Sequence, residues 1–257
     1  MPIISTAGLA RTFTGRSGPV EAVRGIDLTV RPGEILGLLG PNGAGKTTTL
    51  RMLTTLLPPT GGAATIAGHD LVKDPAAVRR RIGYVAQSGG LDPQETVRSE
   101  LVLQGRLYGL DRTRATGRAE ELAVDLDLTE LLDRPTPTLS GGQRRRLDLA
   151  MGLTHRPEIL FLDEPTTGLD PGSRADLWAL VRRLRDEHGT TVVLTTHYLD
   201  EADALADRIV VVDQGTVVAE GSPAALKAAH GAATLQDAFL AITGRGPAPA
   251  DTTPVAV

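Results

Sequence analysis

The residues that most clearly could bind a ligand form a glycine-rich loop. The stretch Gly40-Pro41-Asn42-Gly43-Ala44-Gly45-Lys46-Thr47 fits the pattern G-x-x-x-x-G-K-[ST] in full. Glycines let the backbone turn so that successive N–H groups point inward at phosphate oxygens. Lys46 would bring a full positive charge to the β- and γ-phosphates, the Thr47 hydroxyl would bind Mg²⁺, and Thr48 would donate a further hydrogen bond to phosphate. The sequence therefore predicts a nucleotide site.

A pair of carboxylates follows a wholly apolar stretch. Residues 159–162 read Ile-Leu-Phe-Leu, as expected of a strand buried on both faces, and Asp163 and Glu164 come directly after them. Ligands of α/β sheets lie beyond the carboxyl ends of the strands. We predict that Asp163 holds Mg²⁺, usually through water, and that Glu164 is the general base for the water that attacks the γ-phosphate. Alone, such a pair is as often a solvated turn, but the phosphate loop favours the catalytic interpretation.

A second anion-binding helix start lies further along the chain. In Leu139-Ser140-Gly141-Gly142-Gln143, Ser140 is a good N-cap and the two glycines leave their backbone N–H groups uncovered. A helix is expected to follow to about residue 153, so that its positive dipole end faces the same point. One nucleotide site does not obviously need two such helix starts. The next residues, Arg144-Arg145-Arg146, are interpreted as a solvated helix face.

An α/β scaffold must position these residues. A strand over 34–39 is expected to lead into the loop, and a helix to begin at Lys46. Further strands are expected over 63–67, 82–86, 191–195, 209–213 and 216–220, and helices over 71–81, 171–188, 199–206, 223–229 and 235–243. Residues 96–155 read as helical, with breaks near Asp111 and at 134–137. This pattern predicts a nucleotide-binding domain over 1–230 with a helical subdomain inserted at about 96–155, a C-terminal helix within 231–244, and a flexible tail over 245–257.

Net charge, cysteine content and the length of apolar runs indicate which kinds of partner this chain can have. The net charge of the 257 residues is −4, whereas proteins that grip nucleic acid non-specifically are usually basic, so we expect no nucleic-acid partner. There is no cysteine, which excludes disulfides and thiolate metal sites. No apolar run reaches the roughly 20 residues that a membrane helix needs, and residues 1–6 lack the features of a signal peptide. We therefore expect that any role in transport requires a separate membrane partner.

Together these motifs resemble the ABC transporter ATPase family over roughly residues 3–230. The loop 40–47 matches the Walker A motif, 139–143 the signature, and Asp163-Glu164 the end of the Walker B strand. In the family's order, the resemblance assigns Gln87 to the Q-loop, 168–170 to the D-loop and His197 to the switch position, and it places Phe13 as the aromatic that stacks on adenine. A lone Gln, His or Phe is more often surface or core, so these three assignments depend on order and spacing.

The resemblance implies a P-loop NTPase fold of the ABC type, with a mixed sheet core, an N-terminal antiparallel β region and an inserted α-helical subdomain. It implies ATP hydrolysis with Mg²⁺, in which Glu164, His197, Lys46 and Gln87 are catalytic and Thr47, Gln87 and Asp163 surround the metal. Two copies would face each other head to tail. The residues expected to bind ATP across that dimer are Ser140, Gly141, Gly142, Gln143 and Asp170.

Several stretches resemble a narrower branch, the daunorubicin-resistance ATPases that pair with ABC-2-type permeases. They are 104–110, 144–150, 195–203 and 235–240. Gln143 and His197 follow the general family pattern where members of that branch often have other residues. The resemblance implies a peripheral subunit at the cytoplasmic face of the cell membrane, which energises export of a drug, lipid or other hydrophobic compound. It also implies that a groove around 88–109 receives a short helix of the permease, and that 235–243 either caps the domain or binds a partner.

Other functions remain open at this point. A GTPase would need an Asn-Lys-x-Asp guanine reader, but Asn42 is the only asparagine, and a kinase has no use for the motif 139–143. A non-transport ABC protein usually has two ATPase domains or long coiled-coil or basic insertions, and we find neither. An ABC importer would have the same catalytic core, so only the membrane partner would distinguish it.

Overall fold

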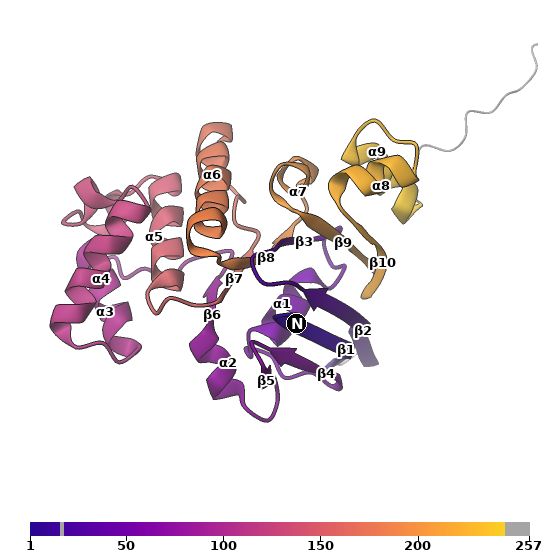
Figure 1. Cartoon of the computed structure of the whole chain (residues 1–257), viewed down its shortest axis with the longest axis horizontal. Coiled ribbons are helices and arrows are strands. Elements are labelled where there is room, and N and C mark those ends of the chain that lie inside the picture. The colour runs from indigo at the N-terminus through magenta and orange to yellow at the C-terminus, as the bar shows by residue number, and fades with distance from the viewer. Residues whose placement is uncertain (16–17, 245–257) are drawn as a thin grey trace, which may run out of the picture.

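The computed structural model describes residues 1–15 and 18–244, and the tail predicted over 245–257 lies outside them. Two β-sheets enclose helix α1 (Lys46–Leu53), and further helices cover the far side of the larger sheet (Figure 1). Leu50, Met52 and Leu53 of α1 share one buried core with both sheets. The helix that follows the glycine loop is therefore fixed between two layers.

The larger sheet carries the motifs. Its strands are β3 (Ile35–Leu39), β6 (Ile82–Val85), β7 (Ile159–Asp163), β8 (Thr191–Thr196), β9 (Arg208–Asp213) and β10 (Thr216–Gly221), in the order β10-β9-β3-β8-β7-β6. All are parallel except β10, which pairs antiparallel with β9. Along β7, Ile159 and Phe161 face the core around α1, whereas Leu160 and Leu162 face the core beneath the helices. This strand is buried on both faces, as its apolar sequence predicts.

The smaller sheet is antiparallel throughout, in the order β2-β1-β4-β5. Its strands are β1 (Ile4–Gly15), β2 (Gly18–Val30), β4 (Gly61–Ile66) and β5 (His69–Asp70). The antiparallel region is as expected, but the sequence alone did not delimit β1 or the first half of β2. The β1–β2 register shifts between Thr6 and Leu9, where Gly8 has φ of +58°. This bulge interrupts the alternation of apolar and polar residues on which strand prediction depends.

A helical insertion separates β6 from β7. It contains α3 (Val97–Leu107), α4 (Arg112–Asp125) and α5 (Gly141–Leu153), with 3₁₀ turns at Thr129–Leu131 and Thr136–Thr138. The breaks expected near Asp111 and at 134–137 are confirmed. Asp111 caps α4 by accepting a hydrogen bond from the backbone N–H of Arg114 at 2.9 Å. Beside the insertion stands α6 (Pro171–His188), with the predicted bounds (Figure 1).

Three shorter helices close the opposite end of the larger sheet. They are α7 (Leu199–Leu205), α8 (Pro223–Ala229) and α9 (Leu235–Thr243), and they bury Leu226 and Leu235 against Ile209 and Val211. The remaining helix, α2 (Pro75–Arg81), is shorter than the predicted 71–81. It begins at Pro75 because the Asp74 side chain accepts a hydrogen bond from the Ala77 N–H and so caps the helix there.

Candidate active site

Four adjacent parallel strands deliver the candidate residues to one edge of the larger sheet. In the order β3-β8-β7-β6, these strands are followed by the glycine loop, His197, Glu164 and Gln87. The strand register aligns them, because Leu39 pairs with Thr196, Asp163 with Thr195 and Val85 with Leu162. Since the carboxyl ends of parallel strands share an edge, residues far apart in the sequence meet there.

The glycine loop makes a tight turn before α1. Gly45 is the N-cap of α1, with φ of +104°, and no side chain satisfies the first N–H groups of the helix. A Cβ at Gly45 would lie 2.6 Å from the carbonyl oxygen of Ala22, and one at Gly40 would lie 2.2 Å from that of Val212. Glycine is therefore required at both positions, and the open helix start is directed at the site as an anion-binding end.

Lys46 is buried and directs its ammonium group back into the loop. Its Nζ donates hydrogen bonds to the carbonyl oxygens of Gly40 at 2.7 Å and Pro41 at 3.0 Å. Burial lowers the pKa of Lys46, while the nearby carboxylates of Glu164 and Asp163 raise it in part. Next to it, the Thr47 and Thr48 side chains are partly exposed at the start of α1. The loop thus places one cation and two hydroxyls at the helix start.

Asp163 is held by hydroxyl groups from neighbouring elements. Its Oδ1 accepts hydrogen bonds from Thr47 at 2.9 Å and Thr195 at 2.7 Å, and its Oδ2 accepts one from the Tyr84 hydroxyl at 3.4 Å. Carboxylate and hydroxyl oxygens are ligands that suit Mg²⁺, which usually takes one or two carboxylates plus phosphate oxygens and water. Among the described residues no cluster of three or more His, Asp or Glu could hold a metal alone. This donor set fits a Mg²⁺ ion that is shared with phosphate.

Glu164 lies at the centre of a polar group built from three elements. Its Oε2 accepts hydrogen bonds from Gln87 Nε2 at 3.0 Å and from the Thr167 hydroxyl at 3.2 Å, and its Oε1 lies 3.2 Å from His197 Nδ1. The backbone of Glu164 has φ of +45°, which is uncommon for a residue with a side chain and typical of functional sites. The structure therefore brings Glu164, Gln87 and His197 together, while their catalytic roles stay predictions.

The motif 139–143 forms a separate helix start. The Ser140 hydroxyl accepts a hydrogen bond from the Gln143 N–H at 3.2 Å, and the Gln143 side chain accepts one from the Ser140 N–H at 2.9 Å, so the two residues form a capping box. Gly141 and Gly142 begin α5, in the helical layer beside α6, while α1 lies on the other side of the sheet (Figure 1). The two anion-binding helix starts thus belong to different layers of the chain.

The expected D-loop, residues 168–170, is in contact with the start of α5 through Ser173. Asp170 caps α6, because its carboxylate accepts hydrogen bonds from Ser173 N–H at 3.0 Å and Ser173 Oγ at 2.6 Å, and these bonds lower the pKa of Asp170. A Cβ at Gly142 would lie 2.8 Å from Ser173 Oγ. Gly142 and Asp170 are therefore linked through one serine, which the sequence did not single out.

Phe13 belongs to the smaller sheet. It lies on β1 opposite Val20, is 38% exposed, and has the Arg11 guanidinium 4.8 Å from the centre of its ring. The role of Phe13 as an adenine platform stays a prediction.

The interpretation of Arg144-Arg145-Arg146 as one solvated face is wrong for Arg145. Consecutive residues of a helix point about 100° apart, so three arginines cannot share a face. Arg144 is exposed, Arg146 pairs with Asp127 and Asp176, and Arg145 is buried. The other site residues that the sequence did not reveal, Thr195, Tyr84 and Thr167, lie one strand across from a motif or just after it. The strand order is needed to place Thr195 and Tyr84 beside Asp163, whereas Thr167 follows Glu164 by three residues on the same loop.

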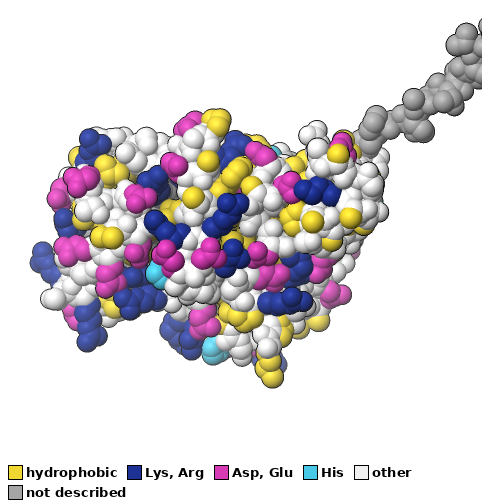
Figure 2. All heavy atoms as spheres, turned by 45° about the horizontal axis from the view of Figure 1, so that its top comes forward, with side chains coloured by type: hydrophobic (Ala, Val, Ile, Leu, Met, Phe, Trp, Pro, Cys, Tyr) yellow, Lys and Arg dark blue, Asp and Glu magenta, His cyan; other side chains and the backbone are white. Residues whose placement is uncertain are grey.

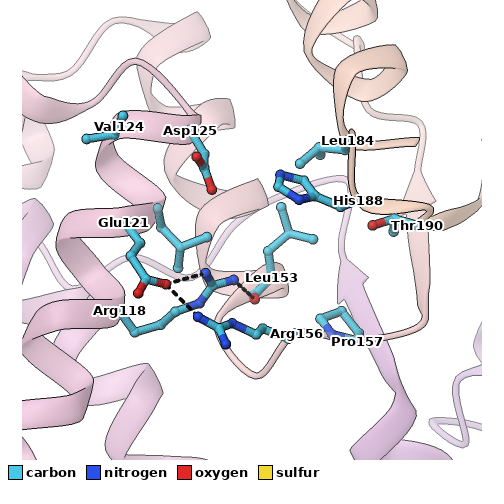
Figure 3. Close-up of a pocket in the computed structure, with 11 residues that line it drawn as sticks. Arg118, Glu121, Val124, Asp125, Leu153, Arg156, Pro157, Leu184, His188 and Thr190 are labelled. Carbon is cyan, nitrogen blue, oxygen red and sulfur yellow. Dashed lines mark hydrogen bonds and ion pairs between the residues drawn. The ribbon is translucent and has the colours of Figure 1, made fainter. Parts of the chain in front are cut away.

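The structure also contains two cavities outside the group formed by Lys46, Asp163 and Glu164. One, of about 340 Å³, is lined by Leu56, Tyr84, Gly89, Gln104 and Tyr108, which includes the region where a groove was expected. The other, of about 690 Å³, lies between α4, α6 and the turn after α5 (Figure 3). There Arg118 and Arg156 both pair with Glu121 beside Leu153 and Leu184. No helix in the described ranges 1–15 and 18–244 is long and apolar enough to cross a membrane.

Comparisons with known proteins identify the family. The model of the ABC transporter family matches residues 23–167, more than half of the chain. The daunorubicin/doxorubicin resistance ATP-binding protein DrrA of Streptomyces peucetius is 51% identical over 91% of this chain and 69% of its own length. The Nod factor export ATP-binding protein I of Burkholderia lata is 43% identical over 84% of this chain and 71% of its own length.

Solved structures agree with this assignment. A dimeric bacterial ABC transporter cassette is 27% identical, covers 85% of this chain and 98% of its own, and superposes with a TM-score of 0.77. The fold, the ordered motifs and these similarities lead to one conclusion. The chain belongs to the ABC transporter family, as an ATP-binding and ATP-hydrolysing subunit.

Proposed function

We propose that this chain hydrolyses MgATP within a head-to-tail dimer and energises export of a drug, lipid or other hydrophobic compound through a separate ABC-2-type permease. The observation that carries the proposal is the meeting of Lys46, Asp163, Glu164, Gln87 and His197 at the ends of four adjacent strands. Resistance and export proteins are among the relatives, which supports the direction of transport. An importer ATPase remains the alternative, because it would use the same catalytic edge.

The loop and α1 bind the triphosphate in this proposal. The backbone N–H groups of 40–45 and the start of α1 face its oxygens, and Lys46 exchanges its bonds to the Gly40 and Pro41 carbonyls for bonds to phosphate. Thr48 donates a further hydrogen bond. Mg²⁺ would neutralise developing charge on the phosphates, and Thr47, Asp163 and Gln87 are the residues that would surround it.

Glu164 is the proposed general base. Gln87 and His197 approach its two carboxylate oxygens from β6 and β8, so a water bound between these groups is oriented for attack on the γ-phosphate. His197 also contacts the γ-phosphate, and Gln87 senses it. Hydrogen bonds from Gln87 and Thr167 hold the Glu164 carboxylate, which supports its preorganisation for this step.

The proposed dimer accounts for the second anion-binding helix start, at the beginning of α5. The motif 139–143 and the glycine loop of one chain lie in different layers, which supports a nucleotide site completed by a second copy. Ser140 to Gln143 would then bind the γ-phosphate of the ATP held by the partner, with Asp170 beside them. A related cassette forms a dimer in its solved structure, which supports this arrangement.

A membrane protein is the proposed second partner, which would hold the chain at the cytoplasmic face of the membrane. The cavity beside Gly89 and Tyr108 adjoins the segment after Gln87 and could receive a short helix. Acidic and basic side chains are interspersed over the face in Figure 2.

The experiment is to purify the chain from membranes at its native expression level and identify its companions by mass spectrometry. A polytopic protein of the ABC-2 type is expected, and ATP-driven export by the pair in vesicles would support the direction. Recovery with ribosomes or DNA and never with a membrane protein would contradict the transport proposal while leaving the ATPase chemistry intact.

A further inference from the structure

Arg145 connects the signature helix to the catalytic edge of its own chain. It lies on α5, five residues after Ser140, and its side chain is 7% exposed. The guanidinium donates hydrogen bonds to three backbone carbonyls: Ala86 at 2.6 Å, Pro165 at 2.8 Å and Asp163 at 3.3 Å. A planar guanidinium spreads its donors over three nitrogens in a rigid fork, so it can reach three separated acceptors, whereas the donors of a lysine all converge on one nitrogen.

The three acceptors flank the residues assigned to hydrolysis. Ala86 immediately precedes Gln87, and Asp163 and Pro165 stand on either side of Glu164. One side chain therefore fixes the two peptide segments that carry the Gln87–Glu164 hydrogen bond of 3.0 Å. A small displacement of such groups has a large effect on rate, since a shift of about 1 Å can cost about 100-fold.

Asp148, one turn further along α5, completes this arrangement. It is 10% exposed and lies 3.7 Å from the guanidinium of Arg145. Burial lowers the pKa of Arg145 and raises that of Asp148, and each charge offsets part of the other's shift. A Cβ at Gly89 would lie 2.3 Å from Asp148 Oδ1, so the aspartate also touches the segment after Gln87. The buried pair thus contacts the chain before Gln87, at Ala86, and after it, at Gly89.

We propose that Arg145, supported by Asp148, is a positioning residue that sets the Gln87–Glu164 contact by fixing both peptide segments to the signature helix. This inference rests on the proposed roles of Gln87 and Glu164. It goes beyond them because Arg145 itself touches neither nucleotide nor water in the proposed mechanism.

The test compares Arg145→Gln and Arg145→Lys with the wild-type full chain. Arg144→Gln is the matched control, because Arg144 is the exposed neighbour on the same helix. We expect Arg145→Gln to lower kcat for ATP hydrolysis about tenfold, with nucleotide affinity within about twofold of wild type. Arg145→Lys keeps the charge beside Asp148 but loses the fork of donors, so a smaller loss of kcat is expected, and Arg144→Gln should match wild type.

A double-mutant cycle separates positioning from general stability. In a Gln87→Ala background the Gln87–Glu164 contact no longer exists, so adding Arg145→Gln should lower kcat by less than about twofold. Full additivity of the two losses would overturn the proposal, as would wild-type kcat in Arg145→Gln. If Arg145→Gln does not fold, wild-type kcat in folded Arg145→Lys overturns it instead. A wild-type chain without ATPase activity would contradict the proposed function, which is a different outcome.

Discussion

The Thr47 hydroxyl donates a hydrogen bond to Oδ1 of Asp163 at 2.9 Å, which joins the first turn of α1 to the end of β7. The two oxygens are the pair assigned to Mg²⁺. We expect Thr47→Ala to raise the Mg²⁺ concentration needed for half-maximal ATP hydrolysis about tenfold, because one ligand and its orientation are lost. Titration of activity with Mg²⁺ at saturating ATP measures this. Thr47→Ser keeps the hydroxyl and should behave as wild type; an unchanged Mg²⁺ requirement in Thr47→Ala would contradict the assignment.

Glu164→Gln should separate binding from hydrolysis. The amide keeps the shape and can still interact with Gln87 and His197, but it cannot accept the proton of water. We expect kcat to fall by about 10²- to 10⁴-fold while ATP still binds. Steady-state kinetics and equilibrium binding of a fluorescent ATP analogue measure the two effects. Glu158→Gln, next to the start of the same strand, serves as the control, and normal turnover in Glu164→Gln would remove Glu164 from the mechanism.

The ion pair between Glu34 and Arg208 predicts a pH-dependent contribution to stability. Burial alone would raise the pKa of Glu34, but hydrogen bonds from the Arg208 side chain and the Arg31 N–H, and both positive charges, hold it below its ordinary value of 4.5. Glu34 Oε1 lies 2.6 Å from Arg208 Nε. A lowered pKa in the folded state stabilises the protein above the pKa of the unfolded state, and this contribution is lost as pH falls through the folded value.

Glu34→Gln is therefore expected to lower the free energy of unfolding by about 2 kcal/mol at pH 7. The difference from wild type should begin to shrink as the pH falls below the ordinary pKa of about 4.5. It should be lost only once the pH has fallen below the lowered pKa of folded Glu34, where both proteins are neutral at this position. Urea unfolding at a series of pH values measures it. Asp133→Asn, which removes an exposed partner of Arg98, should be almost without effect. A difference that grows toward low pH would contradict the assignment.

Gly83 and Gly152 allow α5 to pack directly on β6. A Cβ at Gly83 would lie 2.3 Å from the carbonyl oxygen of Gly152 and 3.0 Å from Leu160 Cδ1. We expect Gly83→Ala to destabilise the protein by about 2–3 kcal/mol, because backbone must move to admit the methyl group. Chemical denaturation measures the loss. Gly117→Ala, on an exposed turn of α4 with open space around it, should be neutral or stabilising; equal destabilisation by both would show that packing at Gly83 is not the cause.

The cavity beside Gly89 predicts where a membrane partner binds. Leu56 lines it and is 59% exposed, so a charge there meets water in the free chain but would be buried against a docked helix. We expect Leu56→Asp to reduce recovery of the permease with the chain by at least about tenfold, with basal ATPase activity retained. Val124→Asp is the control, because Val124 is 67% exposed and lines the other cavity (Figure 3). Equal losses in both variants would argue against this docking site.

The sequence predicted most elements that have strong local signals. The bounds of α6 follow from Asp170 and Pro171 at its start and from Gly189, with φ of +65°, at its end. The strand β1 lacked such a signal because of its bulges. For the site, motif spacing predicted the glycine loop, Asp163 and Glu164. Spacing could not predict Thr195 or Arg145, because their contacts depend on which strands are neighbours and how deeply α5 is buried.

The opposite edge of the larger sheet, where β3, β6, β7 and β8 begin, holds none of the residues assigned to the nucleotide. Glu187, near the end of α6, is exposed there, just before the turn that enters β8. Fluorescent labels, affinity handles or surface tethers attached at such a position would leave the phosphate chemistry untouched. The direction of the strands thus puts the candidate site at one edge of the sheet and leaves the opposite edge available for labelling or immobilisation.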